Sequence, residues 1–110
     1  DDVAQLYIAY FNRLPDAEGL AYWNNLIASG TSVDAVARYF ASTDEFRALY
    51  GTASTQRYVS KVYANALCRE ADSIGLFYWS GLIDGADLTR YGMAIWLVQN
   101  AEFEMMIAER

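Results

Sequence analysis

A doubled segment constrains this chain more than any other feature of its sequence. Residues 3–27 and 59–83 align without a gap at a shift of 56 residues, and ten positions are identical. The identical pairs are Val3/Val59, Tyr7/Tyr63, Arg13/Arg69, Asp16/Asp72, Gly19/Gly75, Leu20/Leu76, Tyr22/Tyr78, Trp23/Trp79, Leu26/Leu82 and Ile27/Ile83. With one residue inserted near Leu88, the match continues from Glu45-Phe46 to Glu102-Phe103. Self-similarity at this period indicates duplicated supersecondary structure.

The apolar pattern predicts helices and requires no strand. Apolar residues between Val3 and Phe11 follow the spacing of one helical face. Pro15 disfavours helical backbone angles at Leu14, so we expect this first helix to end near Arg13.

Capping residues predict the remaining boundaries. In the first half we expect the second helix to begin after an Asp16 cap and end at Gly30, the third to have a Thr31 or Ser32 cap, and the fourth to begin with a Ser42–Glu45 capping box. In the second half we expect a helix from about Ser54 to Arg69, followed by a sixth helix with an Asp72 cap and an end at Gly85. An Asp87 cap then begins a helix to about Val98, and an Asn100 cap begins the last helix. The prediction is an all-α fold. It is a single compact domain over 1–110 with about eight helices, built from two tandem four-helix repeats (about 1–51 and about 54–110) with pseudo-symmetry.

Two glycines of the doubled segment lie inside predicted helices. Gly19 and Gly75 each cost about 1 kcal/mol relative to alanine at such a position. We expect the reason to be close approach of another helix, and the alternative is a notch for a ligand.

An arginine and an aspartate recur at a spacing of three. Arg13 precedes Asp16, and Arg69 precedes Asp72. This spacing would let each guanidinium group reach back across the corner between two helices, to the carboxylate or to free carbonyls, as a structural brace.

A tyrosine-tryptophan pair closes the segment in each copy. Neighbouring residues differ by about 100° around a helix, so the two side chains of each pair cannot face the same way. We expect Trp23 and Trp79 to be core and Tyr22 and Tyr78 to be half-exposed. The two tyrosines are therefore the candidates for contact with a ligand or partner, because exposed aromatic rings can stack on sugars or on a partner's side chains.

Composition excludes several classes of function. The net charge of −6 repels phosphate backbones, so nucleic acid is not an expected partner. The chain has no histidine, which excludes the usual catalytic triads and histidine-based zinc sites. Its acid pairs lie at predicted helix N-termini, where capping explains them. We therefore expect no catalytic residue, cofactor or metal. A looser calcium site using Asp16, Asp84 or Asp87 stays open as an alternative.

Two further expectations concern a cysteine and the membrane. Cys68 is expected to be a small buried apolar residue near the end of a helix. No apolar run approaches the roughly 18 residues of a membrane span, and no signal-peptide pattern is present. We expect the chain to be a module of something longer.

The motif Arg-x-x-Asp-x-x-Gly-Leu-x-Tyr-Trp resembles that of the bacterial domain of unknown function DUF4214. Here it is preceded by Leu6-Tyr7 and followed by Ser42-x-x-Glu45-Phe46, and the resemblance covers nearly the whole chain. The second copy departs from it where Ala71 replaces the proline. The resemblance implies an extracellular or cell-surface location in large bacterial proteins, such as surface-layer (S-layer) and calcium-dependent repeat (RTX-type) proteins. It carries no known catalytic residue.

Three functions remain for such a chain. The first is a non-catalytic helical interaction or scaffolding module that binds a protein or glycan partner. The second is a carbohydrate-binding module that uses exposed aromatic residues such as Tyr22 and Tyr78. The third is a carboxylate-based glycoside hydrolase, which needs two acids roughly 5–10 Å apart across a cleft.

Overall fold

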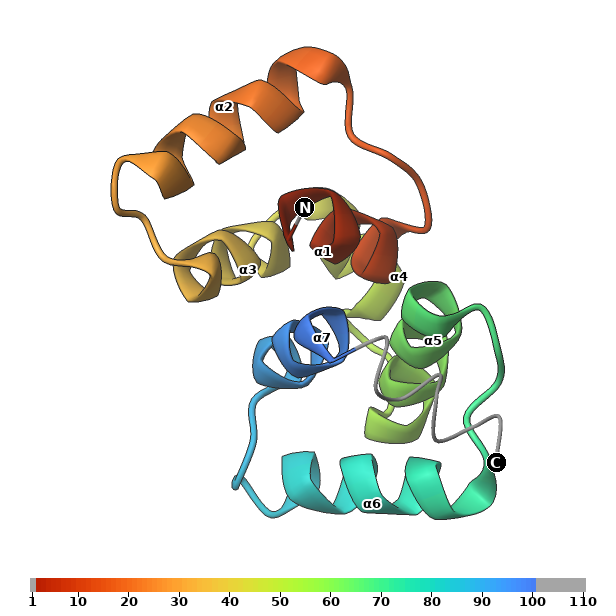
Figure 1. Cartoon of the computed structure of the whole chain (residues 1–110). Coiled ribbons are helices and arrows are strands. Elements are labelled where there is room, and N and C mark those ends of the chain that lie inside the picture. Colours follow the sequence, from red (N-terminus) through yellow and green to blue (C-terminus); the bar gives the residue numbers. More distant parts are fainter. Residues whose placement is uncertain (1, 101–110) are drawn as a thin grey trace.

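Seven helices make up the chain between residues 2 and 100, the part that the computed structural model describes (Figure 1). They are α1 (Asp2–Phe11), α2 (Ala17–Ala28), α3 (Val33–Ala41), α4 (Asp44–Tyr50), α5 (Thr55–Leu67), α6 (Ser73–Asp84) and α7 (Arg90–Gln99). No strand occurs in this range, so the predicted all-helical class is confirmed. The eighth helix predicted after Asn100 lies outside the described residues. Within them, no helix combines the length and apolar character needed to cross a bilayer.

The helices form a centre and two flanks. In the middle of the molecule α1 contacts α3, α5 and α7, and α7 also contacts α3 and α5. α2 lies beyond α1 at one end, and α6 lies against α5 at the opposite end (Figure 1). The outer sides of α2 and α6 therefore point away from each other.

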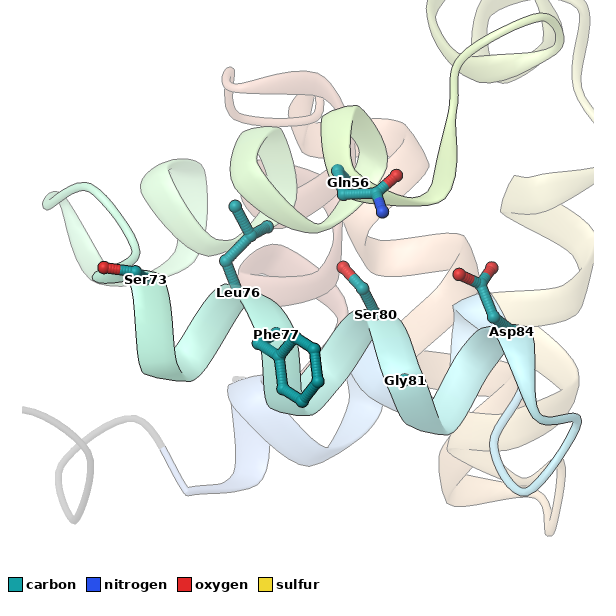
Figure 2. Close-up of a pocket in the computed structure, with 7 residues that line it drawn as sticks. All are labelled: Gln56, Ser73, Leu76, Phe77, Ser80, Gly81 and Asp84. Atoms are coloured by element: carbon teal, nitrogen blue, oxygen red, sulfur yellow. The ribbon is translucent and has the colours of Figure 1, made fainter.

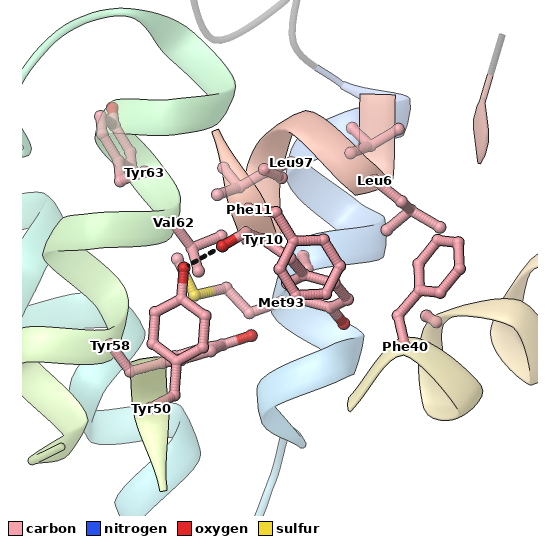
Figure 3. Close-up of a cluster of buried hydrophobic side chains, with 14 of the residues drawn as sticks. Leu6, Tyr10, Phe11, Phe40, Tyr50, Tyr58, Val62, Tyr63, Met93 and Leu97 are labelled. Atoms are coloured by element: carbon pink, nitrogen blue, oxygen red, sulfur yellow. Dashed lines mark hydrogen bonds between the residues drawn. The ribbon is translucent and has the colours of Figure 1, made fainter. Parts of the chain in front are cut away.

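One aromatic-rich core joins the central helices, and its members come from six of the seven helices (Figure 3). The buried residues are Val3, Leu6, Ala9, Tyr10, Phe11, Val36, Ala37, Phe40, Phe46, Tyr50, Tyr58, Val59, Val62, Tyr63, Leu67, Trp79, Met93, Ala94, Leu97 and Val98. α2 contributes only partly buried residues, including Leu20 and Trp23. A single core of this kind explains why the two halves of the sequence fold as one compact unit.

The ends of α1 and α5 correct the predicted boundaries. Both helices stop two residues earlier than expected, at Phe11 and Leu67 rather than at Arg13 and Arg69. The next residue in each case has a left-handed backbone, with φ of 55° at Asn12 and 57° at Cys68. A left-handed residue ends a helix whatever follows it, so the proline further along does not set the boundary. Cys68 is also exposed, not buried, because it lies in this turn.

Two predicted caps are wrong by one or two positions. The cap of α4 is Thr43, which accepts a hydrogen bond from Phe46 N at 3.2 Å, because the Ser42 hydroxyl donates to Tyr39 O at 2.6 Å and closes α3 instead. The cap of α7 is Thr89, not Asp87. The Asp87 N–H is bonded to Leu82 O at 3.0 Å, which keeps that residue in the turn that ends α6. Asn100 ends α7, and its side chain donates to Trp96 O at 2.8 Å.

Candidate functional site

The two aspartates that occupy the same position in the two copies of the doubled segment are helix caps, as predicted. Asp16 Oδ1 accepts a hydrogen bond from Gly19 N at 2.6 Å, and Asp72 Oδ1 accepts one from Gly75 N at 2.6 Å. Both cap residues have the extended backbone that a helix N-cap adopts. The carboxylates of these two residues are therefore committed to their own helices.

The glycines do not receive another helix. A Cβ atom added to Gly19 would lie 2.9 Å from Asp16 Oδ1, and one added to Gly75 would lie 3.1 Å from Asp72 Oδ1, and none of the seven described helices other than their own has an atom within 4 Å. The predicted close approach of a second helix is therefore wrong, and the notch for a ligand stays a prediction. The small residue instead leaves room for the capping carboxylate of the same helix.

The arginines brace other groups than the predicted aspartates. Arg13 forms an ion pair with Glu45 of α4 at 2.8 Å, and this hydrogen bond raises the pKa of Arg13. Arg69 donates to the Tyr63 hydroxyl and, at 3.3 Å, to Glu70 O. The predicted reach to a free carbonyl at the corner is confirmed for Arg69, whereas the reach to the capping carboxylate is wrong for both arginines, whose side-chain partners are Glu45 and Tyr63.

The tyrosines of the motif point outward at opposite ends of the molecule. Tyr22 is 59% exposed and Tyr78 is 58% exposed, whereas Trp79 is only 6% exposed and Trp23 is half-buried. Since α2 and α6 are far apart in Figure 1, the fold does not bring the two tyrosines together into one site. Each would have to act separately.

The outer face of α6 carries two apolar residues that the sequence reasoning missed. Ile74 is 83% exposed and Phe77 is 82% exposed, and Tyr78 lies beside them. A signal for them was present in the doubled segment. At the matching positions of the first copy the chain has Glu18 and Ala21. The second copy alone therefore presents a large apolar surface at this place.

A pocket of about 300 Å³ adjoins this face, between α6 and the start of α5. Its lining consists of Gln56, Ser73, Leu76, Phe77, Ser80, Gly81 and Asp84. Figure 2 shows Phe77 projecting from α6, while the Ser80 hydroxyl points towards α5, where Gln56 lies. Clefts of this kind, mainly apolar with a few polar groups, are the usual form of ligand sites.

Two polar groups of this pocket differ in how they are satisfied. Ser80 is 4% exposed, and its hydroxyl has no hydrogen-bond partner among residues 2–100. Asp84 Oδ1 accepts a hydrogen bond from the Thr55 hydroxyl at 2.6 Å, which holds the carboxylate in place at the end of the pocket. The lining therefore combines one fixed charge with one buried hydroxyl that no described residue satisfies.

The lining also limits the chemistry available. It contains one acid, Asp84, and neither lysine nor arginine. A two-carboxylate mechanism would need a second acid on the other side of the pocket. Among residues 2–100 no three or more histidine, cysteine, aspartate or glutamate side chains are grouped as they would be to hold a metal ion.

The sequence model described as "Domain of unknown function (DUF4214)" matches residues 2–49 and 37–107 of this chain. The chain therefore belongs to the DUF4214 family. No curated protein and no solved structure matches it.

Proposed function

We propose that this DUF4214 domain is a non-catalytic helical module through which a larger secreted or cell-surface bacterial protein binds a partner, with α6 as the binding face. The observation that carries the proposal is the exposure of Ile74 and Phe77 next to a pocket. Isolated exposed apolar residues are common, but an apolar cluster that borders a pocket is typical of a binding surface. Tyr78 extends the same surface with the residue type that interfaces favour.

A duplication that later specialised is consistent with this role. We infer two four-helix units, about 1–51 and about 54–110, related by pseudo-symmetry. In support, each half has an aspartate-capped helix and an arginine over a tyrosine ring, with Arg13 5.0 Å from the centre of Tyr7 and Arg69 4.9 Å from that of Tyr63. The first copy would then serve the fold, and the second would also supply the binding face.

A binding role fits the lining of the pocket better than a hydrolase does. Asp84 is the one acid there, and it is held by Thr55. Asp16 and Asp72, which precede α2 and α6, are occupied as caps. A glycoside hydrolase is therefore the weaker alternative, whereas carbohydrate binding without catalysis fits the same pocket.

The test uses the purified 110-residue chain and intact cells of the producing bacterium, from which a surface-protein fraction and a polysaccharide fraction are also prepared. We expect the chain to bind cells and one of the two fractions. The double variant Ile74→Glu/Phe77→Glu should bind at least about tenfold more weakly, because loss of central apolar contacts costs more than about 1 kcal/mol each.

The matched control is Tyr22→Ala on α2, at the opposite end of the molecule, which should bind like the unaltered chain. Circular dichroism of each variant checks that the helices remain. Absence of binding to cells and to both fractions, or equal binding by the double variant, would show that α6 is not the binding face.

A further inference from the structure

We propose that the pocket between α5 and α6 binds one pyranose ring of a neutral saccharide, with the apolar face of the ring against Phe77 and its hydroxyls towards Ser80, Asp84 and Gln56. This assignment rests on α6 being the binding face, and it names the ligand. Tyr22 and Tyr78, the aromatic candidates from the sequence, are not part of the lining.

The unpartnered hydroxyl of Ser80 is the first argument. Buried polar groups are almost always hydrogen-bonded, and each exception needs an explanation. Among the described residues the Ser80 hydroxyl has no partner, and its oxygen is enclosed at the edge of the pocket, so a ligand can supply the missing bond once the Ser80 side chain rotates about its Cα–Cβ bond. A serine hydroxyl both donates and accepts, which suits a ligand made of hydroxyl groups.

The shape and exposure of Phe77 are the second argument. The ring is 82% exposed and borders the pocket, so its flat face is available to a ligand. The axial hydrogens on one side of a pyranose ring form a flat apolar surface, which can cover an aromatic ring without losing hydrogen bonds. Leu76 extends the apolar wall beside it.

The charge of the lining is the third argument. Asp84 is an acceptor held in place by Thr55, and Gln56 offers both a donor and an acceptor. With no cation in the lining and a net charge of −6 on the chain, phosphate and carboxylate ligands are repelled. Neutral hydroxylated ligands are the class that this set of groups can satisfy.

Space in the pocket is the fourth argument. A volume of about 300 Å³ lies at the small end of ligand sites and suits a single ring with the rest of the chain outside. A Cβ atom added to Gly81 would have no heavy atom within 4 Å, so this wall of the pocket is open. The first copy has Ala21 in place of Phe77 and Ala28 in place of Asp84, and it therefore lacks the equivalent groups.

The test is titration of the full chain with a fixed panel of neutral probes, followed by saturation-transfer NMR. The panel consists of the methyl glycosides of glucose, mannose and galactose, N-acetylglucosamine, and the polymers dextran and mannan. We expect at least one probe to bind, with saturation transfer to its ring protons that is weaker in Phe77→Leu.

Four variants separate saccharide binding from the docking of apolar side chains. Phe77→Leu keeps an apolar side chain but loses the flat face, so saccharide affinity should fall about tenfold, while Phe77→Tyr should retain it. Ser80→Ala should weaken binding severalfold without lowering Tm, because the hydroxyl has no partner in the free protein. Gly81→Leu should fill the pocket and abolish binding. Lys61→Ala, in a different hollow, is the control.

Each result decides a different statement. If no probe of the panel binds, or if Phe77→Leu and Ser80→Ala bind as well as the unaltered chain, the saccharide assignment is wrong. If surface protein still binds and requires Ile74 and Phe77, the binding face on α6 stands while the saccharide assignment falls. If saccharide binds but neither the α6 double variant nor Gly81→Leu weakens it, both proposals fail.

Discussion

Single residues at the start of α2 and α6 decide whether these outer helices begin where they do. Asp16 and Asp72 each satisfy a backbone N–H that the first turn of a helix leaves free. Because α2 contributes only partly buried residues to the core, its stability depends more on such local bonds than that of a central helix does.

The first prediction concerns Asp16. Replacing it with alanine should lower the free energy of unfolding by about 0.5–2 kcal/mol, the usual value of a lost N-cap. Urea unfolding followed by circular dichroism measures the change. Asp16→Asn is the matched control, since an asparagine oxygen can still accept the bond, and it should lose little. Equal losses in both variants would mean that charge, not capping, is the contribution of this residue.

The second prediction at this scale concerns Ser80. Its hydroxyl is buried without a partner, so Ser80→Ala should leave the free energy of unfolding unchanged or raise it. The same urea experiment measures it, with Ser54→Ala as a contrast, because Ser54 caps α5 through a bond to Arg57 N at 3.1 Å and its loss should destabilise. A clear loss of stability in Ser80→Ala would show that the hydroxyl is satisfied in solution.

Whole elements are joined by side chains that bond to the ends of other helices. The last turn of α1 has free carbonyls, and two of them are used in this way: Tyr50 of α4 donates to Tyr10 O, and Asn65 of α5 donates to Ala9 O at 3.0 Å. Arg90 of α7 likewise donates to Tyr50 O at 3.2 Å. These bonds join α4 and α5 to the end of α1, and α7 to the end of α4.

The third prediction therefore concerns Tyr50. Tyr50→Phe keeps the ring in the core but leaves the Tyr10 carbonyl without its partner, and it should lower the free energy of unfolding by about 1–3 kcal/mol. Tyr39→Phe is the control, because the ring of Tyr39 is exposed and its change should be within about 0.5 kcal/mol. If the two variants are equally stable, the bond between α4 and α1 contributes nothing.

At the scale of the whole molecule, three tyrosines meet in one core. Burial raises the pKa of Tyr50 to about 12 from its ordinary value of 10.0, and it also raises the pKa values of Tyr10 and Tyr58. As the pH rises above 10, the unfolded chain loses these phenolic protons while the folded chain keeps them. Proton release then favours unfolding, whereas below the ordinary pKa both states are protonated and the full stability is present.

The fourth prediction is that stability falls steeply in alkali. Between about pH 10 and pH 12 the free energy of unfolding should fall by up to about 1.4 kcal/mol per pH unit for each buried tyrosine. Urea unfolding at a series of pH values from about 8 to 11 measures the slope. Tyr50→Phe should show a shallower slope, since one titrating group is gone. A stability that stays constant above pH 10 would contradict the burial of these hydroxyls.

Local signals in the sequence were enough for the class of fold and for part of the capping. The periodic apolar residues predicted the helices, and Asp16 and Asp72 were identified as caps because an N-cap acts on residues two or three positions away. The caps at Thr43 and Thr89 were missed by one or two positions. In both cases the residue predicted as the cap, Ser42 or Asp87, is hydrogen-bonded to the end of the preceding helix instead.

The candidate site depended on contacts between distant parts of the chain. Nothing near Ser80 in the sequence says that its hydroxyl is buried without a partner, and nothing near Phe77 says that its ring is exposed. Both facts arise from the way α6 lies on α5. The partner of Arg13 likewise depends on tertiary structure, because Glu45, which lies 32 residues away in the sequence, accepts its hydrogen bond and Asp16 does not.

By itself, the sequence determined that this chain is helical, that its motif caps helices, and that its charge disfavours nucleic acid, because each of these depends on neighbouring residues or on composition. Only the tertiary structure decided which aromatic residues reach solvent and which bury their hydroxyls in the core. Exposure is a property of how helices pack, and packing joins residues that are far apart in the chain. The sequence alone indicated the tyrosines of the doubled motif as the candidate site, whereas the tertiary structure indicates the face of α6, where the two copies of the segment differ.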